Sequence, residues 1–265
     1  MKNKPVILKL GGSVITKKDE ALTPNLQAIT RLSKEIFKAN PPSIIIVHGG
    51  GSYGHPIAKK YDIAQGLKEE SQIFGFSETH EAMVSLNKLV VESLMEKGLP
   101  AFGMAPSSFV VTKKGRIQVF EEKPLMQALK LGLIPILYGD AVLDYEQGFA
   151  ILSGDQMASM LAVKTNAKKL IMGVDVDGLY TANPKTDPSA RLIPHLTLES
   201  LQQLKNKIGG ANVTDVTGGM LGKVLELTAP IEHEVEVMIV NALKPYNIYK
   251  ALKGEEVIGT KIVKE

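Results

Sequence analysis

The sequence of 265 residues is long enough to bury a sizeable core, and its 44% apolar and 22% charged residues are typical of a globular protein. Its net charge of +3 comes from lysines and arginines spread along the whole chain, so we expect no nucleic-acid partner and instead an anionic small molecule. The absence of cysteine excludes disulfides and thiolate chemistry, and the lack of any apolar segment of ~18 residues predicts no membrane partner and a cytoplasmic location.

Short apolar runs that end in glycine recur along the chain, and each is followed after a loop by a helix-like pattern. We expect strands at residues 6–10, 44–47, 133–138, 170–172, 234–240 and 256–263. Helices are expected over 24–39, from a cap at Ser77 to about Gly98, and over 155–165. Turns at 114–115 and 144–148 predict two hairpins. This alternation predicts an α/β fold, a three-layer αβα sandwich with a mainly parallel central sheet.

No linker rich in proline, glycine or serine divides the chain. From about Lys169 the pattern restarts with a strand, an acidic glycine-containing loop and further helices. We therefore expect an N-terminal lobe at residues 1–168 and a C-terminal lobe at residues 169–265, which share one continuous sheet.

The glycine-rich segment after residues 44–47 matches the dinucleotide pattern G-x-G-x-x-G through Gly49, Gly51 and Gly54. The match is weak, because the acidic residues at the required distance, at positions 69 and 70, do not follow an apolar strand. The Walker pattern fails as well, since residues 218–224 have the wrong glycine spacing and a valine where a hydroxyl should follow the lysine. Neither standard nucleotide-binding motif is present.

Three glycine turns nevertheless lie at strand ends or helix starts, at residues 11–13, 49–51 and 218–219. Glycine lets backbone N–H groups approach an anion closely, and helix N-termini favour negative charge, so turns that converge at one sheet edge would make a polyphosphate cradle. Each turn taken alone could equally be a tight turn without a ligand. Lysines near these turns suit phosphoryl transfer, which needs positive groups around the moving phosphoryl.

Lys9 lies between two leucines directly before its glycine turn, where burying an ammonium group is costly, so we expect it to point into the cradle. Lys18 could instead lie in an ordinary solvated loop, and Lys223 could be an ordinary charge on a helix surface. His48 is expected to bond local backbone beneath its turn.

The segments KLGGSVITKK, VHGGGSYGHP, ILSGDQ, GVDVDGLYTANP and DVTGGMLGK resemble the amino acid kinase superfamily, and within it the isopentenyl phosphate kinase family, over nearly the entire chain. That family phosphorylates isopentenyl phosphate with ATP in isoprenoid biosynthesis. The resemblance implies the amino acid kinase fold and a homodimer formed through the N-terminal lobe. It also implies that this lobe binds the acceptor, that the C-terminal lobe binds ATP, and that Mg²⁺ arrives on ATP oxygens rather than in a protein cage.

The resemblance further implies roles for individual residues. Lys18 would stabilise the transition state, and Lys9, His55 and Lys223 would complete the catalytic set. The positions that match nucleotide-binding residues are Lys9, Gly11, Gly12, Ser13, Gly51, Asp175, Gly178, Tyr180, Gly219 and Lys223. Those that match acceptor-binding residues are Gly50, His55 and Gly154. No residue is expected to bind a metal directly.

An oxygen of a phosphate monoester is already anionic near neutral pH, so it needs a donor that aligns it rather than a general base, and the imidazole of His55 suits that task. The alternative for His55 is a cap on a helix that begins at Pro56. Asp155 could cap the helix that it starts, or could organise the ammonium groups of Lys9 and Lys18.

None of the three arginines, at positions 31, 116 and 191, adjoins a glycine turn, so the clamp expected for an amino-acid carboxylate is poorly represented. A wall for a prenyl chain could be formed by Ile73, Phe74, Phe76, Met83, Leu86, Val90, Phe149 and Ile151, with core packing as the alternative for most of them. Kinases of fosfomycin, uridylate or acylglutamate, and a nucleotide sensor without turnover, remain open.

Overall fold

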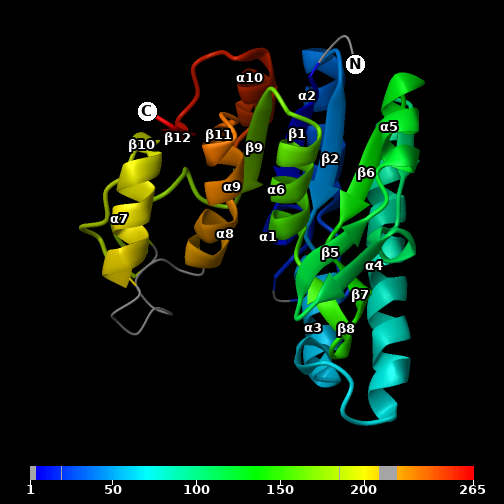
Figure 1. Cartoon of the computed structure of the whole chain (residues 1–265). Coiled ribbons are helices and arrows are strands. Elements are labelled where there is room, and N and C mark those ends of the chain that lie inside the picture. Colours follow the sequence, from blue (N-terminus) through cyan, green and yellow to red (C-terminus); the bar gives the residue numbers. More distant parts are fainter. Residues whose placement is uncertain (1–3, 19, 185, 209–219) are drawn as a thin grey trace.

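A large sheet runs through the whole molecule in the computed structural model, which describes residues 4–18, 20–184, 186–208 and 220–265 (Figure 1). Its eight strands follow the order β10-β12-β11-β9-β1-β2-β6-β3. They are β1 (Val6–Leu10), β2 (Ile44–His48), β3 (Ala101–Gly103), β6 (Ile134–Tyr138), β9 (Lys169–Val174), β10 (His195–Thr197), β11 (Glu236–Asn241) and β12 (Gly259–Val263). Neighbouring strands are parallel, apart from the antiparallel pair β11 and β12. The predicted mainly parallel sheet is confirmed.

The central strands are mostly apolar because helices cover both faces of the sheet. Every residue of β1, β2 and β6 is buried. The register aligns Leu10 with His48, and His48 with Tyr138, at the carboxyl ends of these three strands. The segments that follow the strands therefore meet at one edge of the sheet.

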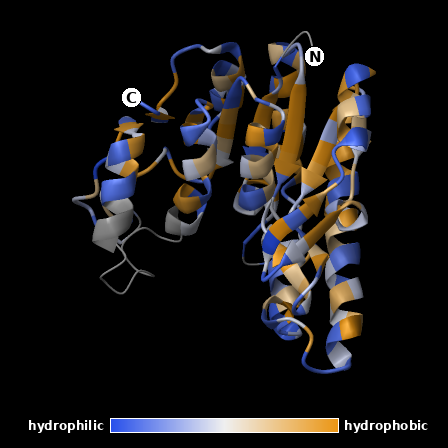
Figure 2. Cartoon of the chain, in the orientation of Figure 1, coloured by the Kyte–Doolittle hydropathy of each residue, from blue (hydrophilic) through white to orange (hydrophobic). Residues whose placement is uncertain are grey.

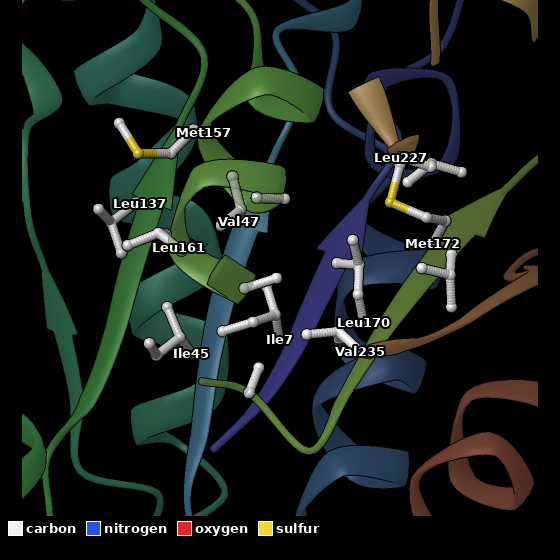
Figure 3. Close-up of a cluster of buried hydrophobic side chains, with 14 of the residues drawn as sticks. Ile7, Ile45, Val47, Leu137, Met157, Leu161, Leu170, Met172, Leu227 and Val235 are labelled. Carbon is white, nitrogen blue, oxygen red and sulfur yellow. The ribbon is translucent and has the colours of Figure 1, made fainter. Parts of the chain in front are cut away.

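Two buried clusters, one on each face, make the three layers (Figures 1 and 2). One cluster joins the sheet to the helices α5 (Lys123–Lys130), α6 (Gly154–Lys164), α7 (Leu198–Ile208), α8 (Met220–Glu226) and α9 (Thr228–Glu232). Figure 3 shows its centre, where Ile7, Val47 and Leu161 lie close together. The other cluster joins the opposite face to α2 (Leu26–Ala39), α4 (Ser71–Met95) and α10 (Asn247–Lys253). The predicted αβα sandwich is confirmed.

The two predicted hairpins are also present, and together they form a second sheet in the order β5-β4-β7-β8. Its strands are β4 (Val110–Lys113), β5 (Arg116–Phe120), β7 (Asp140–Asp144) and β8 (Gly148–Leu152). The carboxylate of Asp144 accepts the backbone N–H of Gly115 at 2.8 Å in one turn and that of Glu146 at 2.9 Å in the other. Its pKa is held well below the usual range, because these hydrogen bonds outweigh the opposing effect of burial. One side chain thus fixes both hairpin turns.

Short elements fill the carboxyl edge of the large sheet. They are α1 (Gly12–Ile15), α3 (Gly51–Lys60), and the 3₁₀ turns η1 (Ile63–Gln65) and η2 (Pro106–Ser108). In the part of the chain that the structure describes, no helix is both long and apolar enough to cross a membrane.

Two predicted helix starts were wrong. The long helix α4 begins at Ser71 and not at Ser77, whose hydroxyl donates within the helix to Ile73 O at 3.4 Å. The segment just before this helix is held instead by Gln72, whose Oε1 accepts the N–H groups of residues 68 and 69, and the N-cap position itself has no side-chain cap. Pro56 lies inside α3, so His55 does not cap a helix that starts there.

Candidate active site

The first two glycine turns pack directly against each other. A β-carbon built on Gly12 would lie 2.2 Å from the amide nitrogen of Gly51, and one built on Gly51 would lie 2.1 Å from Thr16 Oγ1. Gly51 also has a φ of +51°, which favours glycine. The Thr16 hydroxyl joins the turns, since it donates to Gly12 O at 2.8 Å and accepts the N–H of Ser52 at 3.0 Å. Glycine is required here by close contact between two backbones.

Two further glycines extend this contact, and His48 lies beneath it. The N–H of Gly139 donates to His48 O at 2.9 Å, and a β-carbon on Gly154 would lie 2.9 Å from that same oxygen. The fully buried imidazole of His48 bonds Gly49 O at 3.1 Å and the Asn87 amide at 3.1 Å. Burial lowers the pKa of His48 to about 4, so the ring is neutral. This histidine has the structural position expected beneath its turn.

A cavity of about 160 Å³ opens at these turns, and both charged and apolar side chains line it. Its charged and titratable lining residues are Lys9, His55, Asp140, Asp155 and Lys223. Its glycines are Gly12, Gly49, Gly50, Gly54, Gly139 and Gly154. Its apolar lining residues are Ala58, Met83, Ile151 and Leu152. The cavity can therefore hold an anion next to an apolar group.

Asp155 lies between two lysines at the cavity wall. Lys9 Nζ is 2.7 Å from Asp155 Oδ1, and Lys223 Nζ is 3.3 Å from Asp155 Oδ2. Burial lowers the pKa of Lys9, although Asp155 opposes this effect. Burial would raise the pKa of Asp155, but the two lysines together hold it below its usual range. The three groups carry a net charge of about +1 when all are ionised.

The expected alternatives for Asp155 need correction on two points. The cap of α6 is Ser153, whose hydroxyl accepts the N–H of Gln156 at 3.0 Å. The second lysine on Asp155 is Lys223 and not Lys18, because α8 packs against α6 while Lys18 lies in the exposed loop after α1.

Lys18 instead reaches the loop that follows β9. Its Nζ lies 2.6 Å from Asp175 Oδ2, and its side chain is 54% exposed. Neither Lys18 nor Asp175 is among the residues that line the cavity, so the structure joins two predicted site residues to each other outside that lining.

His55 lies on the first turns of α3, at the exposed margin of the cavity. Its pKa is lowered by partial burial and then by the positive charges of Lys223 and Lys9. The ring is therefore neutral at neutral pH and can donate one hydrogen bond into the cavity.

Several other predicted site residues are absent from the cavity lining. The N–H of Gly11 donates to Gly173 O at 2.8 Å, and Ser13 lies in α1. A β-carbon on Gly178 would lie 2.6 Å from Thr260 Oγ1, which makes that glycine a packing requirement as well. Tyr180 bridges to Leu192 in the loop after β9. Gly219 lies outside the described residues.

The expected apolar wall is only partly present. Met83 and Ile151 line the cavity, whereas Leu86 and Val90 belong to the buried core between α4 and the sheet. Two others face solvent, since Phe74 is 67% exposed and Ile73 is 54% exposed. The rings of Phe76 and Phe149 pack against each other at a tilt of 32°, with centroids 5.4 Å apart. The prediction placed one apolar stripe of α4 beside the cavity. That long helix contacts different elements along its length, so its apolar side chains do not all face the cavity.

Sequence reasoning missed Asp140, which lines the cavity with a completely buried carboxylate. His80 Nδ1 lies 3.0 Å from Asp140 Oδ1 and 3.1 Å from Asp140 Oδ2. The backbone N–H of Ala141 also donates to Asp140 Oδ1, at 2.9 Å. The signal was available, because Asp140 follows Gly139 directly after the apolar strand β6, at the same sheet edge as the glycine turns.

Comparisons with known proteins agree with this geometry. The model of the amino acid kinase family matches residues 4–241, and the chain belongs to that family. It is 43% identical to the isopentenyl phosphate kinase of Methanothermobacter thermautotrophicus, over 97% of this chain and 98% of that protein. It is 34% identical to the isopentenyl phosphate kinase of Methanocaldococcus jannaschii, over 97% of each chain.

Solved structures give the same result. A crystal structure of isopentenyl phosphate kinase superposes with a TM-score of 0.86 at 39% identity, covering 97% of this chain and 99% of that one. An isopentenyl phosphate kinase substrate complex superposes with a TM-score of 0.77 at 27% identity, with the same coverage.

Proposed function

We propose that this chain transfers the γ-phosphoryl group of ATP to isopentenyl phosphate and so forms isopentenyl diphosphate and ADP. The observation that carries this proposal is the cavity itself, because the ion-paired group of Lys9, Asp155 and Lys223 lines the same cavity as a neutral His55 and several apolar side chains. The high identity to isopentenyl phosphate kinases over nearly the whole chain supports the choice of acceptor.

The reaction needs no general base. An anionic oxygen of the acceptor attacks the γ-phosphorus, a new P–O bond forms, and the bond between the γ-phosphorus and the bridging oxygen breaks to release ADP. Negative charge spreads over the transferred group and the leaving oxygen. Lys9 and Lys223 would stabilise that charge from the cavity wall, and Lys18 would do so once it moves from Asp175 to the nucleotide.

His55 would position the acceptor phosphate, together with the backbone of Gly50 and Gly154. Because the imidazole is neutral, it can donate a hydrogen bond to a phosphate oxygen without adding a positive charge that would weaken the nucleophile. The glycines let backbone groups approach the phosphate more closely than any side chain would allow.

The apolar wall and the positions of the arginines favour a hydrocarbon tail on the acceptor. Ala58, Met83 and Ile151 line the cavity, and none of its described lining residues is an arginine. An amino-acid acceptor would need a cationic clamp for its carboxylate, and two of the arginines are already paired with glutamates.

ATP would lie over the first glycine turn and reach the loop after β9. The proposed nucleotide-binding residues are Lys9, Gly11, Gly12, Ser13, Gly51, Asp175, Gly178, Tyr180, Gly219 and Lys223. Residues 1–168 would bind the acceptor and form a homodimer, and residues 169–265 would bind the nucleotide. A cytoplasmic location would supply the ATP.

Mg²⁺ would be carried by the nucleotide. Among the described residues there is no group of three or more histidines, aspartates or glutamates that could hold a metal ion. The cavity carboxylate of Asp155 is held by two ammonium groups, so the chain fits an ion bound mainly to phosphate oxygens and water.

A panel of acceptors tests the proposal. Purified protein with ATP and Mg²⁺ should release ADP with isopentenyl phosphate, at a kcat/KM well above those for dimethylallyl phosphate, fosfomycin, uridylate and N-acetylglutamate. A higher kcat/KM with fosfomycin would place the chain with the fosfomycin kinases. Nucleotide binding without turnover of any acceptor would indicate a sensor.

A further inference from the structure

The hairpin of β4 and β5 contacts two helices that carry charged cavity residues. They are α6, which carries Asp155, and α8, which carries Lys223. Arg116, the first residue of β5, forms two parallel hydrogen bonds with Glu226, the last residue of α8. The Nη1–Oε1 and Nη2–Oε2 distances are 2.5 Å and 2.9 Å. This two-point geometry fixes orientation as well as distance, which a single contact would not do.

The same hairpin is anchored to α6 on either side of Arg116. The carboxamide of Gln156 accepts the N–H of Ile117 at 2.8 Å and donates to Gly115 O at 3.1 Å. Gln156 is buried and directly follows Asp155, the residue that binds both cavity lysines. The backbone of Arg116 is therefore held in place relative to Asp155.

Helix α8 closes the connection. Glu226 follows Lys223 by three residues, so the two side chains lie on the same side of the helix. Lys223 reaches back to Asp155 Oδ2 at 3.3 Å, and Ser159 of α6 donates its hydroxyl to Glu226 O at 2.6 Å. The contacts run from α6 to the hairpin, from the hairpin to α8, and from α8 back to α6.

We propose that Arg116 is a positioning residue, which acts through Glu226 to hold α8 where Lys223 can meet Asp155 and the transferred phosphoryl group. The proposal rests on the function proposed above, in which Lys223 stabilises the transition state. Arg116 does not line the cavity, and its side chain is 64% exposed. The Arg116 end of the pair is exposed to solvent while Glu226 is only 18% exposed, so loss of the arginine removes a solvent-screened contact and should change catalysis more than folding.

Charge reversal tests this role in the full chain. Arg116→Glu and Glu226→Arg should each lower kcat roughly 10- to 100-fold, because small displacements of a catalytic group are costly, and leave the KM for isopentenyl phosphate nearly unchanged. The double variant, with both charges exchanged, should recover most of the lost kcat. Arg116→Lys should fall between these results, since lysine makes a single-point contact. Lys113→Glu is the matched control, because Lys113 pairs with Glu146 on the neighbouring hairpin and not with α8.

A second measurement does not depend on turnover. The rate at which an amine-reactive reagent modifies Lys223, followed by peptide mass spectrometry, should rise several-fold in Arg116→Glu and return in the double variant. Melting temperatures should stay close to that of the wild type. The positioning role is overturned if the single reversals leave Lys223 reactivity and kcat unchanged, or if the double variant recovers neither. A wild-type protein that phosphorylates no acceptor but shows the expected Lys223 reactivities would overturn the proposed function alone.

Discussion

Lys18 and Asp175, 157 residues apart, form a 2.6 Å ion pair that joins the loop after α1 to the loop after β9. Lys18 matches the transition-state lysine of the family and Asp175 matches a nucleotide-binding position, so the pair links the N-terminal and C-terminal parts of the proposed site. Nucleotide binding would then exchange one anionic partner of Lys18, the carboxylate, for another, a phosphate oxygen.

Removing the Lys18 ammonium group should slow the chemical step. Lys18→Ala is expected to lower kcat about 10²- to 10³-fold, the range seen when one donor to a developing charge is lost. Asp175→Asn is the companion variant, because it removes the carboxylate from this ion pair and keeps the lysine. Steady-state kinetics with both substrates check the prediction, and an unchanged kcat in Lys18→Ala would show that this lysine has no catalytic role.

Asp155 should be needed for both stability and activity. Asp155→Asn leaves the buried ammonium of Lys9 without its carboxylate, and breaking such a buried pair costs about 3 kcal/mol or more. We expect a lower denaturant midpoint in chemical unfolding and a large loss of kcat. The control is Glu20→Gln, which removes an exposed partner of Lys17 and should change neither quantity. Wild-type stability in Asp155→Asn would contradict the assigned ion pairs.

His55 should act on the acceptor and not on the nucleotide. His55→Ala is expected to reduce kcat/KM for isopentenyl phosphate strongly, while calorimetry gives an unchanged Kd for ATP. His55→Gln keeps a neutral hydrogen-bond donor and should retain more activity than the alanine variant. Equal loss of ATP affinity in both variants would place His55 on the nucleotide side.

The His80–Asp140 pair predicts a pH dependence of stability. The pKa of His80 is raised above its ordinary value of 6.5 by the hydrogen bond to Asp140, against the effect of burial, with further help from the charges of Asp140 and Glu81. A group whose pKa is higher in the folded state stabilises the fold fully below 6.5, and this contribution is lost as the pH rises through the folded-state value.

The melting temperature of the wild type should therefore fall more between about pH 6 and about pH 9 than that of His80→Gln, which keeps a donor but cannot titrate. Parallel curves for the two proteins would mean that the protonated histidine does not stabilise this wall of the cavity.

The architecture could be predicted because it depends on local patterns. Strands β1, β2 and β6 are mostly apolar runs with a glycine directly after each, and parallel strands bring their carboxyl ends to one edge. Lys9 could be assigned to the cavity because it lies between two leucines in a strand, where burying an ammonium group without a polar partner would be costly.

The pairing within the site could not be predicted in the same way. Whether Asp155 binds Lys18 or Lys223 depends on how α8 packs against α6, and that packing joins residues 68 positions apart. The start of α4 was missed because the helix begins at Ser71 without a side-chain cap, so the sequence carries no capping signal there.

The central claim is that one cavity holds the γ-phosphate between lysines and the acceptor phosphate beside His55. Phosphorus NMR of the complete reaction tests it most directly. With ATP, Mg²⁺ and isopentenyl phosphate, the account predicts that the monoester resonance disappears while the resonances of ADP and of a new diphosphate ester grow in equal amounts. ADP that accumulates with inorganic phosphate, while the monoester stays intact, would contradict it.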